Sequence, residues 1–104
     1  MFGFKERSKT QEPKVKAPEI VIKEQLEKIT NLINKNDVGN ALREISVCDG
    51  MIQQLSMVQQ GKISMWWGGV ATVAKQAAGM PVTMAGQLIS NLKPSILNVY
   101  NLLS

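Results

Sequence analysis

The chain of 104 residues contains no histidine, a single cysteine and no acidic residue after Asp49. Without histidine there is no imidazole to act as a general base, to ligate zinc or to activate a serine or cysteine nucleophile. Cys48 alone can form neither an internal disulfide nor a zinc site, so we expect it to be a small buried apolar residue. No glycine-rich phosphate-binding motif is present. The sequence therefore predicts a protein that is not an enzyme and uses no metal or cofactor.

Charge is distributed unevenly along the chain. All eight acidic residues lie in the first half, whereas residues 51–104 contain only the three lysines Lys62, Lys75 and Lys93 as charged side chains. A helix that faces water normally carries charged residues on its outer side. We therefore expect the second half to be covered by a protein partner, by copies of the chain or by a membrane surface.

The net charge of +4 does not indicate a nucleic-acid partner, because the basic residues form no dense stripe for phosphate contacts. No small-molecule substrate is predicted either. Residues 1–18 are expected to form a flexible basic arm, since they are polar and contain two prolines. They lack the apolar core of a classical signal peptide, which favours an intracellular or virion-associated location over secretion. The tip of the arm is a candidate docking element, formed by Phe2, Phe4, Lys5 and Arg7.

Residues 19–60 are predicted to form a helical hairpin, because apolar residues recur every three or four positions on both of its helices. Asn34-Lys35-Asn36 should end the first helix, Asp37 should cap the second, and Gln60-Gly61 should end it. The first stripe comprises Ile22, Leu26, Ile29 and Ile33, and the second comprises Val38, Ala41, Ile45, Cys48, Ile52, Leu55 and Val58.

Residues 61–104 are predicted to be a low-charge helical packing region. The helical period runs from Ser64 to Leu92, with a break expected at Gly79-Met80-Pro81 and a last short helix opening at Pro94. In that last helix Ile96, Leu97, Tyr100 and Leu103 are expected to face inward. No segment shows the alternation of a strand, so the fold class is all-α, either a small bundle or extended helices packed in an assembly.

The packing region supplies most of the candidate binding residues. Two adjacent tryptophans on a helix point about 100° apart, so we expect one of them to face something outside the hairpin. The candidate partner or membrane interface consists of Trp66, Trp67, Val70, Val73, Met80 and Met84. The candidates for close helix packing are Ala71, Ala74, Ala78 and Ala85, with Gly68, Thr72, Gly79, Thr83 and Gly86 forming a second smooth flank.

Three functions are compatible with these patterns. The preferred one is a non-enzymatic structural subunit that oligomerises or packs on a larger protein assembly through its C-terminal helices, in the style of small viral or phage virion components. The first alternative is a peripheral or membrane-active protein that uses the Trp66-Trp67 helix. A simple transmembrane span is not expected, because Lys75 and Gln76 interrupt the apolar run. The second alternative is a soluble helical-bundle adaptor.

Overall fold

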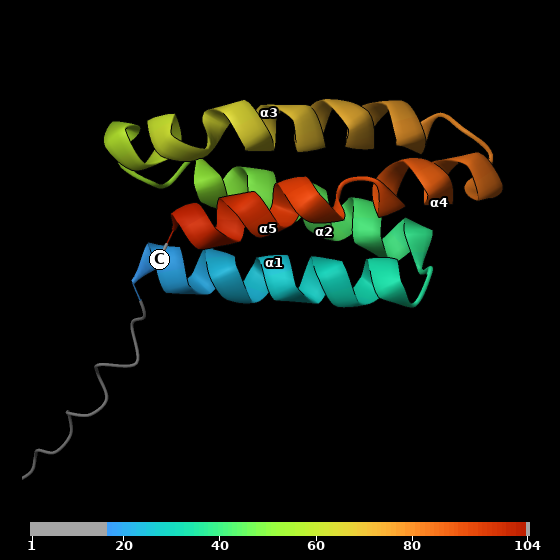
Figure 1. The fold of residues 1–104 in the computed structure, drawn as a ribbon, viewed down its shortest axis with the longest axis horizontal. Helices are drawn as coiled ribbons and strands as arrows, with labels where there is room; N and C mark the ends of the chain where they lie inside the picture. Colours follow the sequence, from blue (N-terminus) through green and yellow to red (C-terminus); the bar gives the residue numbers. More distant parts are fainter. Residues whose placement is uncertain (1–16, 104) are drawn as a thin grey trace, which may run out of the picture.

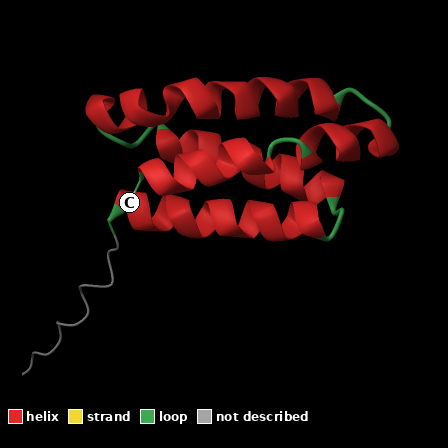
Figure 2. Ribbon diagram, in the orientation of Figure 1, coloured by secondary structure: helices red, strands yellow, loops and turns green. Residues whose placement is uncertain are grey.

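The computed structural model describes residues 17–103, and over this range the chain is all-α, with five helices and no strand (Figure 2). The predicted docking tip with Phe2, Phe4, Lys5 and Arg7 lies outside the described residues. The helices are α1 (Pro18–Asn34), α2 (Val38–Ile52), α3 (Met57–Ala78), α4 (Val82–Ser90) and α5 (Lys93–Leu102).

The helices form a bundle of four segments in which consecutive segments are antiparallel. The last segment is divided into α4 and α5 (Figure 1). Helix α1 packs on α2, α2 on α3, and α3 on both α4 and α5, while α5 returns to contact α1. The end of α5 therefore lies beside the start of α1. Of the two arrangements left open by the sequence, the described chain adopts the bundle.

The apolar stripes of the hairpin form one side of the core. Every member of the first stripe is buried, and so is every member of the second up to Leu55. Cys48 is fully buried, as predicted, and burial together with the nearby Asp49 charge raises its thiol pKa to about 12. Val58 is the exception, because it is 73% exposed. It belongs to the next helix and not to the hairpin.

The boundary between the second and third helices differs from the prediction. Helix α2 ends at Ile52 and α3 begins at Met57, so the expected end at Gln60-Gly61 is wrong. The reason is an N-cap: Ser56 Oγ accepts a hydrogen bond from the backbone N–H of Gln59 at 3.2 Å. This bond satisfies one of the free amides of the first turn and starts a new helix four residues before Gly61.

Proline sets three other helix boundaries as predicted. Helix α1 begins at Pro18, α4 begins directly after Pro81, and Pro94 lies in the first turn of α5. Helix α1 ends at Asn34, and Asn36 in the following turn has a φ of 59°, a conformation that asparagine tolerates better than most residues.

Two side chains take positions other than those expected. Asp37 precedes α2, but its carboxylate accepts a hydrogen bond from Asn40 Nδ2 at 2.9 Å and makes no side-chain cap to the backbone. Leu97 of α5 faces outward and is 58% exposed, whereas Val99 is buried in its place. Ile96 and Leu103 are buried as predicted, and Tyr100 is partly buried.

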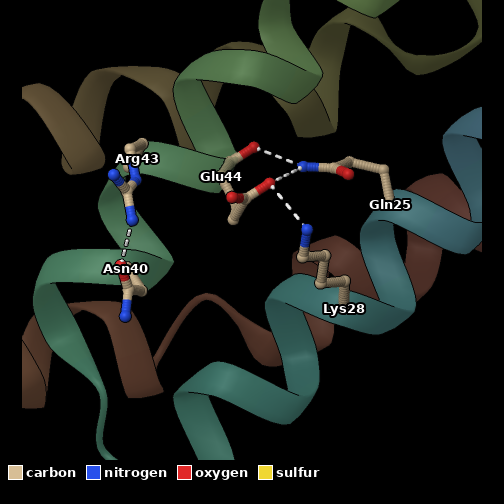
Figure 3. A network of polar contacts seen from close by, with 5 residues as sticks. All are labelled: Gln25, Lys28, Asn40, Arg43 and Glu44. Atoms are coloured by element: carbon tan, nitrogen blue, oxygen red, sulfur yellow. Dashed lines mark hydrogen bonds and ion pairs between the residues drawn. The ribbon is translucent and has the colours of Figure 1, made fainter.

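A polar network joins α1 and α2 on the surface of the hairpin (Figure 3). Gln25 Nε2 donates to the Glu44 carboxylate at 2.7 Å and to the Glu44 carbonyl at 2.9 Å, and Lys28 Nζ lies 3.5 Å from the same carboxylate. The Gln25 hydrogen bond and the positive charge of Lys28 lower the pKa of Glu44. The Glu44 carboxylate is thus satisfied within the hairpin.

Candidate functional site

Helix α3 is the longest described helix, and its exposed side carries no acidic residue. The opposite side of α3 is buried against the bundle and is formed by Ile63, Trp67, Val70, Ala74 and Ala77. The residues that point away from it, here called the outer face, are Met57, Val58, Gly61, Lys62, Met65, Trp66, Gly68, Gly69, Thr72, Lys75 and Gln76. At 100° per residue, Lys62 and Trp66 lie along one edge of this face and Lys75 along the other.

The two tryptophans divide between the core and this face. Trp67 is only 4% exposed, and its indole Nε1 donates to Asp49 Oδ1 of α2 at 2.9 Å. A buried indole needs a partner for its N–H group, and Asp49 of the neighbouring helix α2 supplies the acceptor. Trp66 is 38% exposed at the edge of the outer face. Trp66 is therefore the tryptophan available to contact something outside the chain, and such a contact stays a prediction.

The other candidate interface residues are scattered. Val70 is fully buried, so it and Trp67 belong to the core of the described chain and not to its exposed surface. Val73 and Met80 are partly buried against that core. Met84, on α4, is 55% exposed.

Sequence reasoning missed the most exposed apolar residues, Met57, Val58 and Met65, which are 88%, 73% and 80% exposed. The signal that would have found them is the Ser56 cap, because it fixes where α3 begins.

The four alanines proposed for close packing also divide. Ala74 and Ala85 are buried, Ala71 is partly buried and Ala78 is exposed. Among the described glycines of the helices, the tightest approach is at Gly86, where an added Cβ would lie 3.1 Å from Asn36 Oδ1. Close packing inside this chain therefore occurs where α4 meets the turn between α1 and α2.

Three hairpin carboxylates satisfy polar groups of the acid-free helices. Glu19 accepts from Gln59 Nε2 at 2.8 Å, Asp49 accepts from the Trp67 indole, and Glu27 accepts from the Tyr100 hydroxyl at 3.0 Å. No carboxylate lies on α3, α4 or α5. Within the described chain Lys62 and Lys75 form no ion pair, so the outer face keeps its positive charge.

A hollow of about 930 Å³ opens between α1 and α5. Its floor includes the buried Leu26 and Ile96, and the exposed Leu97 forms part of its rim. A second hollow of about 600 Å³ shares Ser90 and Asn91 with the first. This groove is not predicted from the sequence, because it depends on how α5 packs on α1.

No group of three or more potential metal ligands gathers within residues 17–103. None of the described helices combines the length and apolar character needed to cross a membrane. Comparisons with protein-family models, curated proteins and solved structures find no match for this chain.

Proposed function

We propose that this chain is a non-enzymatic assembly subunit that packs the outer face of α3 against an acidic surface of another protein. The observation that carries the proposal is the exposure of Met57, Val58 and Met65 on a helix face that has no carboxylate. Methionine is flexible and polarisable, and is frequent on surfaces that bind other proteins. Exposed apolar residues that share a face with a polar rim are characteristic of interaction surfaces.

Three glycines on the same face support protein as the partner. A Cβ added at Gly61, Gly68 or Gly69 would meet nothing within 4 Å. Each glycine costs the helix about 0.5–1 kcal/mol relative to alanine, and no contact inside the chain requires it. A partner helix that approaches closely would require small residues there. Gly39 and Gly50 of α2 are equally open, but that face also carries the charged Arg43.

The lysines disfavour pairing of this face with its own copy. Two copies of this face packed together would place four lysines around one interface, two from each copy, and would contribute no carboxylate. Like charges placed together destabilise such a pair, and no carboxylate on the face is available to relieve them. A partner surface with carboxylates fits both edges, which is why we propose an acidic protein.

Site-specific photocrosslinking in the cells that express the chain tests this proposal. A benzophenone amino acid at position 65 should give a discrete adduct with another protein, because Met65 is 80% exposed on the outer face. The same probe at Val47, which is 47% exposed on α2, is the matched control and should give little adduct. Equal adducts at both positions, or none at position 65, would refute the proposal.

A peripheral membrane protein is the second candidate, favoured by the position of Trp66 beside Lys62 on an acid-free face. Purified protein would then sediment with vesicles of phosphatidylcholine and phosphatidylglycerol. Trp66→Ala would abolish the accompanying blue shift in fluorescence, since Trp67 is already buried. A monomer that gives no adduct and ignores vesicles would instead support the soluble adaptor.

A further inference from the structure

The seam between α1 and α5 differs from the outer face of α3, because it is hollow and chemically divided along its length. The larger hollow, of about 930 Å³, is of the size that encloses small organic ligands. Leu26 and Ile96 form its apolar floor, and Pro94 and Leu97 add apolar surface on the α5 side. An apolar chain that lay there would remove the exposed part of Leu97 from water.

The smaller hollow, of about 600 Å³, is more polar, and Ser90 and Asn91 line both hollows. It is lined by amide and hydroxyl side chains, and no carboxylate lines it; Asn36, Thr83, Gln87, Ser90 and Asn91 are among its residues. Lys93 lines the larger hollow, whose lining also includes Ser90 and Asn91. Lys93 Nζ donates to Asn34 Oδ1 at 2.9 Å, and since an amide is neutral this bond leaves the ammonium charge uncompensated.

The one carboxylate of the larger hollow lies toward its other end. Glu27 accepts the hydrogen bond of Tyr100, seven residues along α5 from Lys93, which is about 10 Å in a helix. An anion placed at the Lys93 end is therefore attracted by the lysine and kept away from Glu27. The groove has a cationic, donor-rich end and an apolar middle.

We propose that this groove binds a free single-chain amphipathic anion, independently of any partner on α3. The apolar chain lies over Leu26, Pro94 and Leu97, and the anionic head lies beside Lys93, where Ser90 and Asn91 can donate hydrogen bonds. Charge complementarity at one end and apolar contact along the other select a molecule with one charged head and one short chain.

Titration of the full chain with decanoate, followed by calorimetry and by amide NMR spectra, tests this inference. Decanoate should bind saturably below its micelle concentration and shift amide signals of α1 and α5, including those of Asn31 and Leu97. Decyltrimethylammonium, which has the same chain and a positive head, should bind more weakly. Vesicles of phosphatidylcholine and phosphatidylglycerol should not shift the Leu97 signal, because a lipid headgroup held in a bilayer does not present a free chain to the groove.

Two matched pairs of variants locate the contacts. Lys93→Gln should weaken decanoate binding about two- to fivefold, as expected for an exposed ion pair, whereas Lys75→Gln on α3 should not change it. Leu97→Ser should weaken binding, and Val47→Ser should not. Absence of saturation, equal binding of both head groups, or signal shifts confined to α3 would overturn the proposal without affecting the crosslinking result expected at position 65.

Discussion

The hairpin of α1 and α2 and the three helices that follow it use polar residues in opposite ways. The hairpin carries every described carboxylate and engages several of them in internal bonds, such as that between Glu44 and Gln25. Helices α3 to α5 have no carboxylate, and Gln59, Trp67 and Tyr100 donate to carboxylates of the hairpin. The hairpin thus supplies the hydrogen-bond acceptors for these three side chains of the second half.

This difference shows that the lack of acidic residues in a segment has two separate causes. On the inner side of α3 there is no charge because the side faces the core, as at Val70. On the outer side the apolar residues are exposed, as at Met57 and Met65, and nothing in the described chain covers them. Only the second case indicates a partner.

The largest expected effect is a difference in stability between variants of two adjacent residues, Trp67 on the buried side of α3 and Trp66 on its exposed side. Trp67→Ala should lower the free energy of unfolding by about 3–5 kcal/mol, because it empties a core position and leaves Asp49 without its indole donor. Trp66→Ala should lower it by less than about 1 kcal/mol. Urea denaturation followed by circular dichroism measures both. Similar losses for the two variants would contradict the assignment of Trp67 to the core.

The reactivity of Cys48 tests whether the interior between the two halves is closed to solvent. With a thiol pKa of about 12, its thiolate fraction at pH 8 is about a thousandfold below that of an ordinary cysteine. We expect a thiol reagent to modify the folded protein at least that much more slowly than the urea-unfolded protein. A Val47→Cys/Cys48→Ala variant is the control and should react at an ordinary rate. Fast labelling of Cys48 in the folded chain would show that the hairpin interior is open.

Glycine substitutions give a smaller effect that distinguishes the two kinds of helix surface. Gly68→Ala should stabilise the isolated chain by about 0.5–1 kcal/mol, because its Cβ meets open space. Gly86→Ala should stabilise it less or destabilise it, since the new Cβ would lie 3.1 Å from Asn36 Oδ1. Thermal unfolding compares the two variants. If Gly68 serves close docking of a partner, Gly68→Ala should also reduce the adduct formed at position 65.

The smallest expected effect is a pH dependence of the contact between α1 and α5. The hydrogen bond to Glu27, and then the negative charge of Glu27, raise the pKa of Tyr100 above its usual 10. Because the folded pKa is the higher one, the stabilisation is complete below pH 10 and is lost as the pH rises through the folded value. Ultraviolet titration should show a raised tyrosine pKa that returns toward 10 in Glu27→Gln. An unchanged titration in that variant would contradict the contact.

The sequence predicted the elements that depend on local pattern. The spacing of Ile22, Leu26, Ile29 and Ile33 is unambiguous, and prolines mark helix starts whatever the tertiary context. The predicted start of α3 is wrong because Gly61 resembles a helix end, whereas the cap at Ser56 begins a helix upstream of it. A cap satisfies a free backbone amide, whereas a single glycine within a helix is tolerated.

The candidate surfaces were harder to predict, because they depend on which side of each helix meets its neighbours. Trp66 and Trp67 each lie on a helical stripe that contains apolar residues. Which of the two is buried depends in part on Asp49, a residue of another helix that accepts the hydrogen bond of Trp67. The groove at Leu97 arises from the packing of α5 on α1, which no local pattern specifies.

Methionine oxidation footprinting compares coverage of the outer face in the purified chain and in the cells that express it. Met57 and Met65 should be oxidised rapidly in the purified protein, at 88% and 80% exposure, and should be strongly protected in cells. Met51, which is packed against the core, serves as the slow reference in both samples. Protection of both methionines in cells is the result expected for an assembly subunit. Oxidation of Met57 and Met65 at the same rate in cells as in the purified chain would contradict the proposal that a partner covers α3.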